Sequence, residues 1–230
     1  MRLPSRVATL LAVAALPMAL SACSPDSDGS DKPNPNAGLL TGTQLKRVLA
    51  PASAFPSGFT RQADGTSDSG GTFLSPSHKS TAKPDCTRLE GTAWIQVTGY
   101  KGGVSFAQDD YVNQGKTEEM TQEIDAFQGT TAQAVMKDLR SVAATCASFT
   151  DTDAHATVKV TGRSTAALGD EAYTMTLTSG AWESGTTLIA ARSGHTVVTV
   201  LSTAGSDDGA ATAKKLTAQV LDSLKSKSAA

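Results

Sequence analysis

The sequence predicts an α+β fold, in which an antiparallel β-sheet has helices packed on one face. An apolar stripe at helical spacing runs through residues 131–148, and a second amphipathic segment, 208–225, lies near the end of the chain. Between them, residues 156–203 hold four β-rich runs joined by short links. Strands joined by such short links are antiparallel, and helices with one apolar stripe each pack most simply on one face of the sheet.

The chain begins its folded part with a short helix. This helix is expected over Leu39–Ala50, where Thr41 or Thr43 caps the start and Pro51 stops the end. Residues 59–83 are polar and show no clear period, so we assign no helix or strand to them. The run TSDSGGT inside this stretch predicts a loop, because Gly and Ser favour turns.

Three short elements are expected next. The sequence CTRLEGTAW (residues 86–94) predicts a short helix that ends near Gly91. Apolar and polar residues alternate over Gly103–Val112 and again over Glu118–Phe127, which indicates two strands. The segment NQGKTE between these strands is typical of a turn.

The long helix over Thr131–Ser148 is the clearest element of the chain. Its stripe repeats at steps of four and three residues and contains Val135, Leu139, Val142, Cys146 and Phe149. The strands that follow are expected at Ala156–Thr161, Glu171–Thr178, Thr186–Arg192 and Thr196–Thr203. The glycine-containing links SGAWESG and RSGH between them are typical of hairpins.

The last helix is expected over Asp208–Lys225. Its apolar stripe contains Ala213, Leu216, Val220 and Leu224. Acidic residues stand at its start and lysines at its end, which is the arrangement that the helix dipole favours. Helix, two strands, long helix, four strands and helix is therefore the expected order.

The first 22 residues predict a signal peptide. Arg2 and Arg6 precede an uncharged run, Val7–Leu20, and no other charge occurs before residue 26. A helix of this length spans roughly 21 Å, which is shorter than the ~30 Å hydrocarbon core of a membrane. The run therefore has the length of a signal-peptide apolar region rather than of a membrane span, and Pro17 within it argues against an uninterrupted helix.

The residues Leu20-Ser21-Ala22-Cys23 resemble a bacterial lipobox. The resemblance implies that Cys23 receives a diacylglyceryl group on sulfur and becomes the N-terminus after cleavage behind Ala22. A thiolate is a strong nucleophile, and two acyl chains hold a protein stably on a membrane where one chain binds reversibly. The alternative is an ordinary cleaved secretory signal followed by a chance cysteine.

Residues 24–38 contain almost only Ser, Pro, Asp, Asn, Gly and Lys. Such a segment buries too little apolar surface to offset the entropy of ordering its backbone. We therefore divide the chain into a lipoprotein signal peptide (1–22), the lipidated Cys23 with a flexible linker (23–38), a single α+β domain (39–227) and a short tail (228–230).

The charge of the chain argues against a nucleic-acid partner. The whole sequence has 20 basic and 22 acidic residues. Removal of the signal peptide deletes Arg2 and Arg6, so 18 basic residues remain and the mature net charge is −4. Binding to phosphate backbones requires clustered Lys and Arg, and no basic run follows the signal peptide.

The chain contains three cysteines, an odd number for an exported protein. Lipidation of Cys23 leaves Cys86 and Cys146, and disulfides persist outside the cytosol. We expect these two to pair, which would close a loop of about 60 residues and stabilise the fold by ~4 kcal/mol in the chain-entropy model. The alternative is two separate buried thiols.

The sequence contains no convincing catalytic constellation. It has no G-x-S-x-G elbow, no H-E-x-x-H motif and no glycine-rich phosphate loop. Four groups of residues are candidates for a functional site: three histidines (His78, His155, His195), the segment DTDAH with Asp151 and Asp153, the carboxylates Glu118, Glu119, Glu123 and Asp125, and the tryptophans Trp94 and Trp182. DTDAH can bind a cation or be a solvated connector. Paired carboxylates can act as general acid and base or line a solvated strand face. Tryptophans can line a cleft or anchor the core. We favour the structural alternative in each case and expect no catalytic, metal or cofactor site.

The second half of the chain resembles a known family. The segments LGDEAY (168–173), TTLIAARSGHTVVTVLS (186–202) and ATAKKLTAQVLDSL (211–224) are similar to actinobacterial PknH-like extracellular sensor domains, and MKDLRSVAATCASF (136–149) fits the same pattern. These domains occur on receptor kinases and as free lipoproteins. The resemblance covers residues 40–225 and implies an antiparallel sheet with helices packed on it and a cleft for an unidentified ligand.

The sequence departs from this family in two respects. It contains no kinase and no spanning helix, so the chain cannot signal inward by itself. It also has one cysteine pair where some relatives have two. The expected function is a non-enzymatic binding or sensor-like module on the outer face of the cell membrane, held by lipid on Cys23, for a small envelope ligand or a partner protein. The alternatives are a lipid or glycolipid carrier and a cell-envelope hydrolase.

Overall fold

The structure is a computed structural model that describes residues 33–91 and 94–228. Contacts divide the chain into two units, Met1–Asn34 and Pro35–Ala230, and every element below belongs to the second. The signal peptide and Cys23 lie outside the described residues. Within those residues, no helix has both the length and the apolar character needed to cross a membrane.

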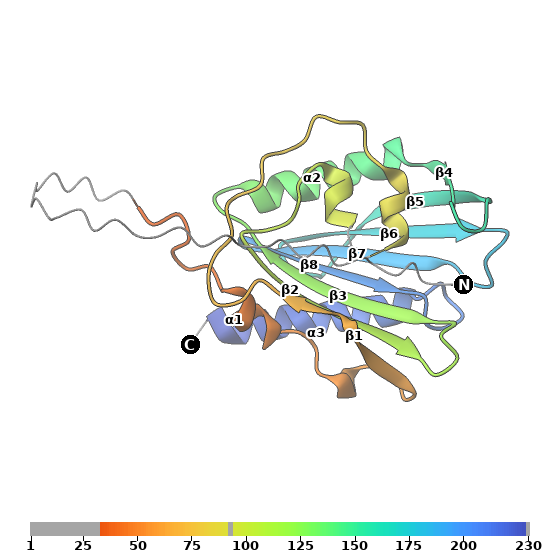
Figure 1. The fold of residues 1–230 in the computed structure, drawn as a ribbon, viewed down its shortest axis with the longest axis horizontal. Coiled ribbons are helices and arrows are strands. Elements are labelled where there is room, and N and C mark those ends of the chain that lie inside the picture. Colours follow the sequence, from red (N-terminus) through yellow and green to blue (C-terminus); the bar gives the residue numbers. More distant parts are fainter. Residues whose placement is uncertain (1–32, 92–93, 229–230) are drawn as a thin grey trace, which may run out of the picture. The chain divides into compact units, whose positions relative to one another are not determined.

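Eight antiparallel strands form one sheet, in the order β1-β2-β3-β8-β7-β6-β5-β4 (Figure 1). Their bounds are β1 (Phe59–Asp68), β2 (Ser105–Asn113), β3 (Glu119–Ala126), β4 (Ser148–Thr150), β5 (Thr157–Thr165), β6 (Glu171–Ser179), β7 (Thr186–Ser193) and β8 (Thr196–Ser202). The expected α+β class with an antiparallel sheet is confirmed.

A single long crossover builds the sheet from two consecutive sets of strands. After β3, helix α2 (Thr131–Thr145) carries the chain to the far edge, where β4 begins. Hairpin connections then lead inward until β8 lies beside β3, with Ile124 opposite Val198. The centre of the sheet therefore joins residues that are 70 or more positions apart in the sequence.

Helices cover both faces of the sheet, so the expectation of helices on one face is wrong. Helix α3 (Ala210–Ser228) packs on β7 and β8 from one side, whereas α2 packs on β5 to β8 from the other (Figure 1). Alternate residues of β8 show this division, since Val198 and Val200 belong to the core beneath α3 and Val197 and Leu201 to the core beneath α2. Central strands that are apolar on both faces require a cover on each.

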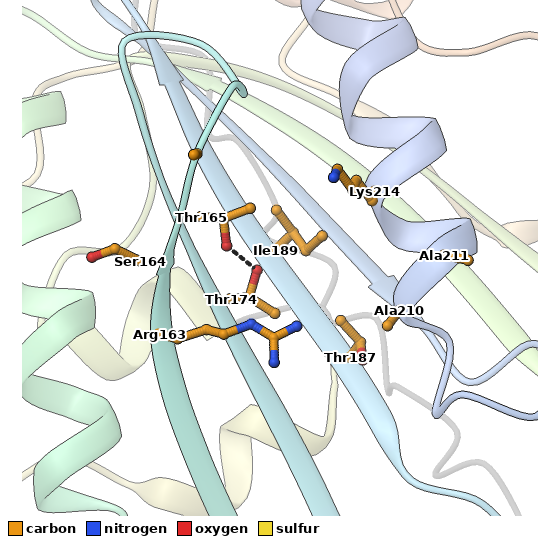
Figure 2. A pocket seen from close by; sticks show the side chains of 10 residues that line it. Arg163, Ser164, Thr165, Thr174, Thr187, Ile189, Ala210, Ala211 and Lys214 are labelled. Carbon is orange, nitrogen blue, oxygen red and sulfur yellow. Dashed lines mark hydrogen bonds between the residues drawn. The ribbon is translucent and has the colours of Figure 1, made fainter.

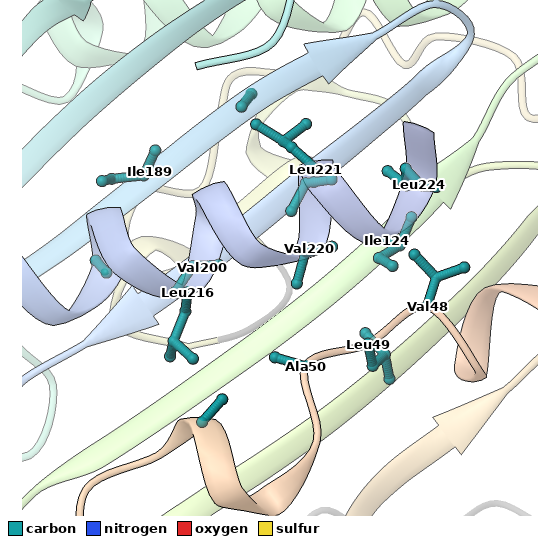
Figure 3. Packing of buried hydrophobic residues seen from close by; sticks show 14 of the residues in the cluster. Val48, Leu49, Ala50, Ile124, Ile189, Val200, Leu216, Val220, Leu221 and Leu224 are labelled. Carbon is teal, nitrogen blue, oxygen red and sulfur yellow. The ribbon is translucent and has the colours of Figure 1, made fainter. Parts of the chain in front are cut away.

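The core beneath α3 combines the last helix with the first folded segment of the chain. Leu216, Val220, Leu221 and Leu224 of α3 pack over the central strands, and Val48, Leu49 and Ala50 continue the same cluster beside Ile124 (Figure 3). Each fully buried aliphatic side chain contributes roughly 1.5–3 kcal/mol to stability. The start and the end of the domain are thus joined through one hydrophobic core.

Helix α1 (Gly42–Lys46) is shorter than the expected Leu39–Ala50 helix. Thr41 caps it in a capping box with Gln44, as one of the two expected caps. It ends at Lys46, and beyond it the Gln122 side chain accepts a hydrogen bond from the Ala50 N–H (2.8 Å) and donates one to the Ala50 carbonyl (2.9 Å). These bonds hold the backbone at Ala50 outside a helix.

The structure contains elements that the sequence did not predict. Strand β1 lies in the stretch 59–83, and its pairing with β2 shifts between Gln62 and Ser67, so no regular alternation is visible in its sequence. Helix α2 ends at Thr145, and the expected last turn instead enters the three-residue strand β4. A 3-10 helix over Trp94–Thr98 follows the expected helix at residues 86–94, which is itself a 3-10 helix over Cys86–Glu90.

A disulfide joins Cys86 to Cys146, with a Cα–Cα distance of 5.6 Å. It connects the Cys86–Glu90 helix to the C-terminal cap of α2. Cys146 is fully buried in the core beneath α2, in agreement with its place on the expected apolar stripe. The loop of 60 residues that this bond closes includes β2 and β3.

Candidate ligand-binding pocket

A pocket of about 410 Å³ lies between the first turns of α3 and the outer part of the sheet (Figure 2). Strands β5, β6 and β7 form one wall and α3 forms the other. The residues that line it are Arg163, Ser164, Thr165, Ala166, Thr174, Thr187, Ile189, Ala210, Ala211 and Lys214. Its volume is within the range of ordinary small-molecule sites.

The pocket exists because the α3 side of these strands has small polar residues near the start of the helix. Helix α3 packs chiefly on β7 and β8, so β5 and β6 extend beyond it. Successive strand residues point to opposite faces, which puts Thr174 and Thr187 on the side of α3. Ala210 and Ala211 face them with side chains too short to fill the space.

Two exposed cationic side chains line this pocket. Arg163 extends from β5 toward β7, and Lys214 extends from α3 over the same space (Figure 2). Neither forms an ion pair with any residue that the structure describes, and no carboxylate is among the lining residues. The pocket is therefore locally positive in a chain whose formal net charge is −2.

The acidic residues at the start of α3 have other partners. Asp207 Oδ2 accepts a hydrogen bond from the Ala211 N–H (2.8 Å), and Asp208 Oδ1 accepts one from the Gly185 N–H (2.7 Å). The first of these bonds caps the helix. The Ala211 N–H at the start of α3 is therefore already occupied by Asp207.

The hydroxyl groups in the pocket differ in how they are satisfied. Thr165 and Thr174 are hydrogen-bonded to each other, with their Oγ1 atoms 2.5 Å apart. Thr187 is fully buried, and its Oγ1 has no hydrogen-bond partner within the described chain. A buried polar group without a partner costs roughly 1–3 kcal/mol. In Thr187, this destabilising hydroxyl therefore belongs to a residue that lines the pocket.

None of the pocket residues was singled out from the sequence. Arg163 and Lys214 are 51 positions apart, Lys214 is one of the two adjacent lysines of the last helix, and Thr187 stands in a β-rich run that looks like ordinary core. The available signal was the Thr-rich pattern of the strands, because Thr at positions that face a helix leaves polar atoms in the core. Only the sheet order and register bring these residues together.

The four carboxylates considered as acid–base candidates, Glu118, Glu119, Glu123 and Asp125, lie on or beside β3. None of them lines this pocket. Glu118 accepts hydrogen bonds from the Gly205 N–H (3.0 Å) and from the Asn113 side chain (3.2 Å), so it holds two loops together. Burial raises the pKa of Glu119 to about 7, with a further contribution from the negative charge of Asp110. The contacts of Glu118 and Glu119 are thus explained by the fold. The three histidines lie in other segments of the chain.

Of the remaining carboxylates of β3, Asp125 is buried and Glu123 is half-buried. Burial raises the pKa of Asp125, although its Oδ1 accepts a hydrogen bond of 2.6 Å from the Gly103 N–H. Glu123 shares the face of Asp125, and its carbonyl accepts a hydrogen bond from Thr199. The expected strand spacing of Glu119, Glu123 and Asp125 is present in β3.

The DTDAH segment forms a turn between β4 and β5. Asp151 Oδ1 accepts hydrogen bonds from the N–H groups of Asp153 (2.8 Å) and Ala154 (2.9 Å). Its Oδ2 accepts one from the Trp182 indole N–H (2.8 Å), so Asp151 is a buried turn residue rather than a solvated one. His155 is exposed, and within residues 33–91 and 94–228 no group of three His, Cys, Asp or Glu side chains is placed to hold a metal ion.

The two tryptophans belong to the core beneath α2, whereas His195 and His78 are exposed. Trp94 is buried in the core beneath α2, and Trp182 packs against the same core. The Nδ1 atom of the exposed His195 lies 2.8 Å from the Gly129 carbonyl oxygen, while His78 lies in the segment between β1 and the Cys86–Glu90 helix. Neither tryptophan lines the pocket at α3.

The segments that resemble the sensor-domain family form an ionic cluster at one end of β6 and β7. Arg192 Nε lies 2.7 Å from Glu171 Oε1, and Arg192 Nη1 lies 2.8 Å from Asp170 Oδ2. Arg140 of α2 binds the second oxygen of Glu171 at 2.5 Å, and the Gly194 N–H donates to Asp170. Burial alone would raise the pKa of Glu171, but the hydrogen bonds from Arg192 and Arg140 hold it below its usual value. These residues stabilise the fold.

Comparison with known proteins identifies the fold. No family model matches the sequence, and no curated protein matches it. The fold is similar to that of the extracellular domain of PknH from Mycobacterium tuberculosis, with a TM-score of 0.52, 14% sequence identity, and coverage of 79% of this chain and 96% of that one. The chain thus has the fold that its family resemblance implied.

Proposed function

We propose that this protein is a lipid-anchored, extracytoplasmic binding module of the sensor-like kind, which captures a small ligand in the pocket between α3 and β5–β7 without transforming it. The likeness to an extracellular domain and the Cys86–Cys146 disulfide support a location outside the cytosol. The lipobox resemblance at residues 20–23 supports an anchor on Cys23.

The pocket is the observation that carries this proposal. It has the volume of a small-molecule site, and it is lined by several hydroxyl groups and by two cations that form no ion pair with any described residue. Hydrolysis would need a nucleophile beside a base or a pair of carboxylates, and the lining residues include no His, Asp, Glu or Cys. A binding role follows more directly from this lining than a catalytic one.

A carrier of lipid or glycolipid is the second candidate. It would need a large dry cavity for acyl chains. The apolar side chains of the pocket at α3 are Ile189 and three alanines, and they lie among Arg163, Lys214 and the threonines. Such a lining suits the polar part of a ligand better than an acyl chain.

The anchor is tested with Cys23→Ala in cells that process lipoproteins, because the variant removes the sulfur that would be acylated. We expect wild-type protein in the detergent phase of membrane extracts and the variant either released into the medium or left as an unprocessed precursor. Ser21→Ala is the matched control, since it keeps a small residue in the motif and should preserve maturation. Normal membrane-anchored maturation of Cys23→Ala would contradict the anchor.

A further inference from the structure

We propose that the pocket between α3 and β5–β7 binds a phosphate group of a small ligand, through Arg163, Lys214 and Thr187. This inference rests on the proposed function, because it names the chemistry of the ligand for the same pocket. Phosphate is the shared chemistry of two sources, a free phosphate ester and the headgroup of an anionic lipid.

The charges at the pocket favour an anion. Arg163 and Lys214 both line it, and neither has an ion-pair partner within the described residues. Two like charges that face one space repel each other, and an anion between them removes that repulsion. Asp207 and Asp208 form no ion pair with either cation within the described residues. Asp207 accepts a hydrogen bond from the Ala211 N–H of α3, and Asp208 accepts one from the Gly185 N–H in the β6–β7 link.

The donors come from three different elements. Arg163 belongs to β5, Thr187 to β7 and Lys214 to α3, so they approach the pocket from separate directions (Figure 2). A tetrahedral oxyanion presents oxygens in several directions, whereas a carboxylate presents two oxygens in one plane. Arginine and lysine are also the usual side chains for phosphate recognition. The arrangement therefore fits phosphate better than carboxylate.

Thr187 supplies the second, independent observation. Its side chain is fully buried, and its Oγ1 has no hydrogen-bond partner among the described residues, although nearly all buried polar groups have one. Thr187 lines the pocket beside Ala210. An oxygen of the ligand would provide the missing partner at this position.

The remaining space accommodates the rest of the ligand. The pocket volume of about 410 Å³ greatly exceeds that of one phosphate group. Ile189, Ala210 and Ala211 give part of the lining an apolar character. A phosphate ester with a compact organic part is therefore the expected ligand class.

The test uses the full chain, held by its own anchor in phosphatidylcholine vesicles, and calorimetric titration with inorganic phosphate and with glycerol 3-phosphate. Arg163→Gln and Lys214→Gln should each weaken binding about tenfold, since each removes a charged hydrogen bond. The matched controls are Lys159→Gln on the same face of β5 and Lys215→Gln on α3, which remove one positive charge outside the lining and should leave binding unchanged.

Thr187→Val tests whether the Thr187 hydroxyl contacts the ligand or is only an unpartnered group in the core. The variant keeps the shape of the side chain and removes the hydroxyl, so the ligand-free protein should be as stable as wild type or more stable. Phosphate binding should fall about threefold if the hydroxyl contacts the ligand. Unchanged binding by Thr187→Val would remove Thr187 from the proposal.

The source of the phosphate is assigned by competition. Phosphatidylglycerol added to the vesicles will compete with inorganic phosphate if the natural ligand is a lipid headgroup, and competition by glycerol 3-phosphate alone assigns a free ester. Loss of affinity in the lining variants and the control variants alike, or no phosphate binding by wild type, overturns the inference. A phosphate-free small molecule that co-purifies with the wild-type chain would then leave the proposed function standing.

Discussion

Gly169 shows how one residue of the family-like segments acts on the backbone. Its φ is +62°, which favours glycine, and a Cβ at this position would overlap the carbonyl oxygen of Arg192. The next two residues, Asp170 and Glu171, bind the side chain of the same arginine. The segment LGDEAY is therefore a structural motif that fixes the turn before β6 against β7.

Gly169→Ala should lower the free energy of unfolding by about 2–3 kcal/mol, because it adds both backbone strain and a steric overlap. Gly194→Ala is the matched control, since Gly194 has a φ of +58° but open space around its Cβ position. Its loss should be about 1 kcal/mol, from strain alone. Urea denaturation of the two variants gives both values, and equal losses would show that the overlap with Arg192 has no effect.

Individual residues also show why the pocket was not predictable. Thr187 lies in TTLIAA, and its neighbours in sequence are core residues. Its unpartnered hydroxyl becomes evident only when β6, β7 and α3 are in place. The Cys86–Cys146 bond was easier to expect, because cysteine counting needs no register.

At the scale of elements, local periodicity predicted the strands from β5 to β8 and the long helices, which each have a clear repeat. Strand β1 was missed because it is a largely exposed edge strand with an irregular register. The two covered faces were missed although LIAA in β7 and VVTVL in β8 are continuous apolar runs. Continuous runs indicate burial on both sides, whereas a sheet covered on one side alternates.

Strand β3 contributes to a pH dependence of the domain's stability, beside Glu90, whose pKa burial also raises to about 7. The folded-state pKa of Glu119 is about 7 against an ordinary value of 4.5, and burial raises that of Asp125 in the same direction. The folded chain therefore holds protons that the unfolded chain releases between these values. In this range the free energy of unfolding falls as the pH rises, so the domain should be more stable at pH 5 than at pH 8.

Thermal unfolding across this pH range tests the prediction with Glu119→Gln, which is neutral at every pH and should reduce the loss of stability toward pH 8. The matched control is Glu183→Gln, which removes an exposed carboxylate from the β6–β7 link and should leave the pH dependence unchanged. The contribution of β3 would be contradicted if Glu119→Gln lost as much stability between pH 5 and pH 8 as the wild type. It would also be contradicted if the stability of the wild type rose over this range.

At the scale of the whole molecule, the residues that stabilise the fold are largely separate from the residues that line the pocket. The two hydrophobic cores and the ionic cluster at Glu171 hold the sheet between its helices. The disulfide secures the end of α2, which packs on the face opposite α3. The pocket lies where α3 leaves β5 and β6 uncovered, so its polar residues are tolerated by a scaffold that is stabilised elsewhere.

The most direct test of this account is the native mass of the protein extracted from its own membranes. We predict a chain that begins at Cys23, carries a diacylglyceryl group, lacks two hydrogens because Cys86 and Cys146 are joined, and releases a small phosphate-bearing molecule on denaturation. A complete 230-residue chain with three free thiols and no released molecule would contradict it.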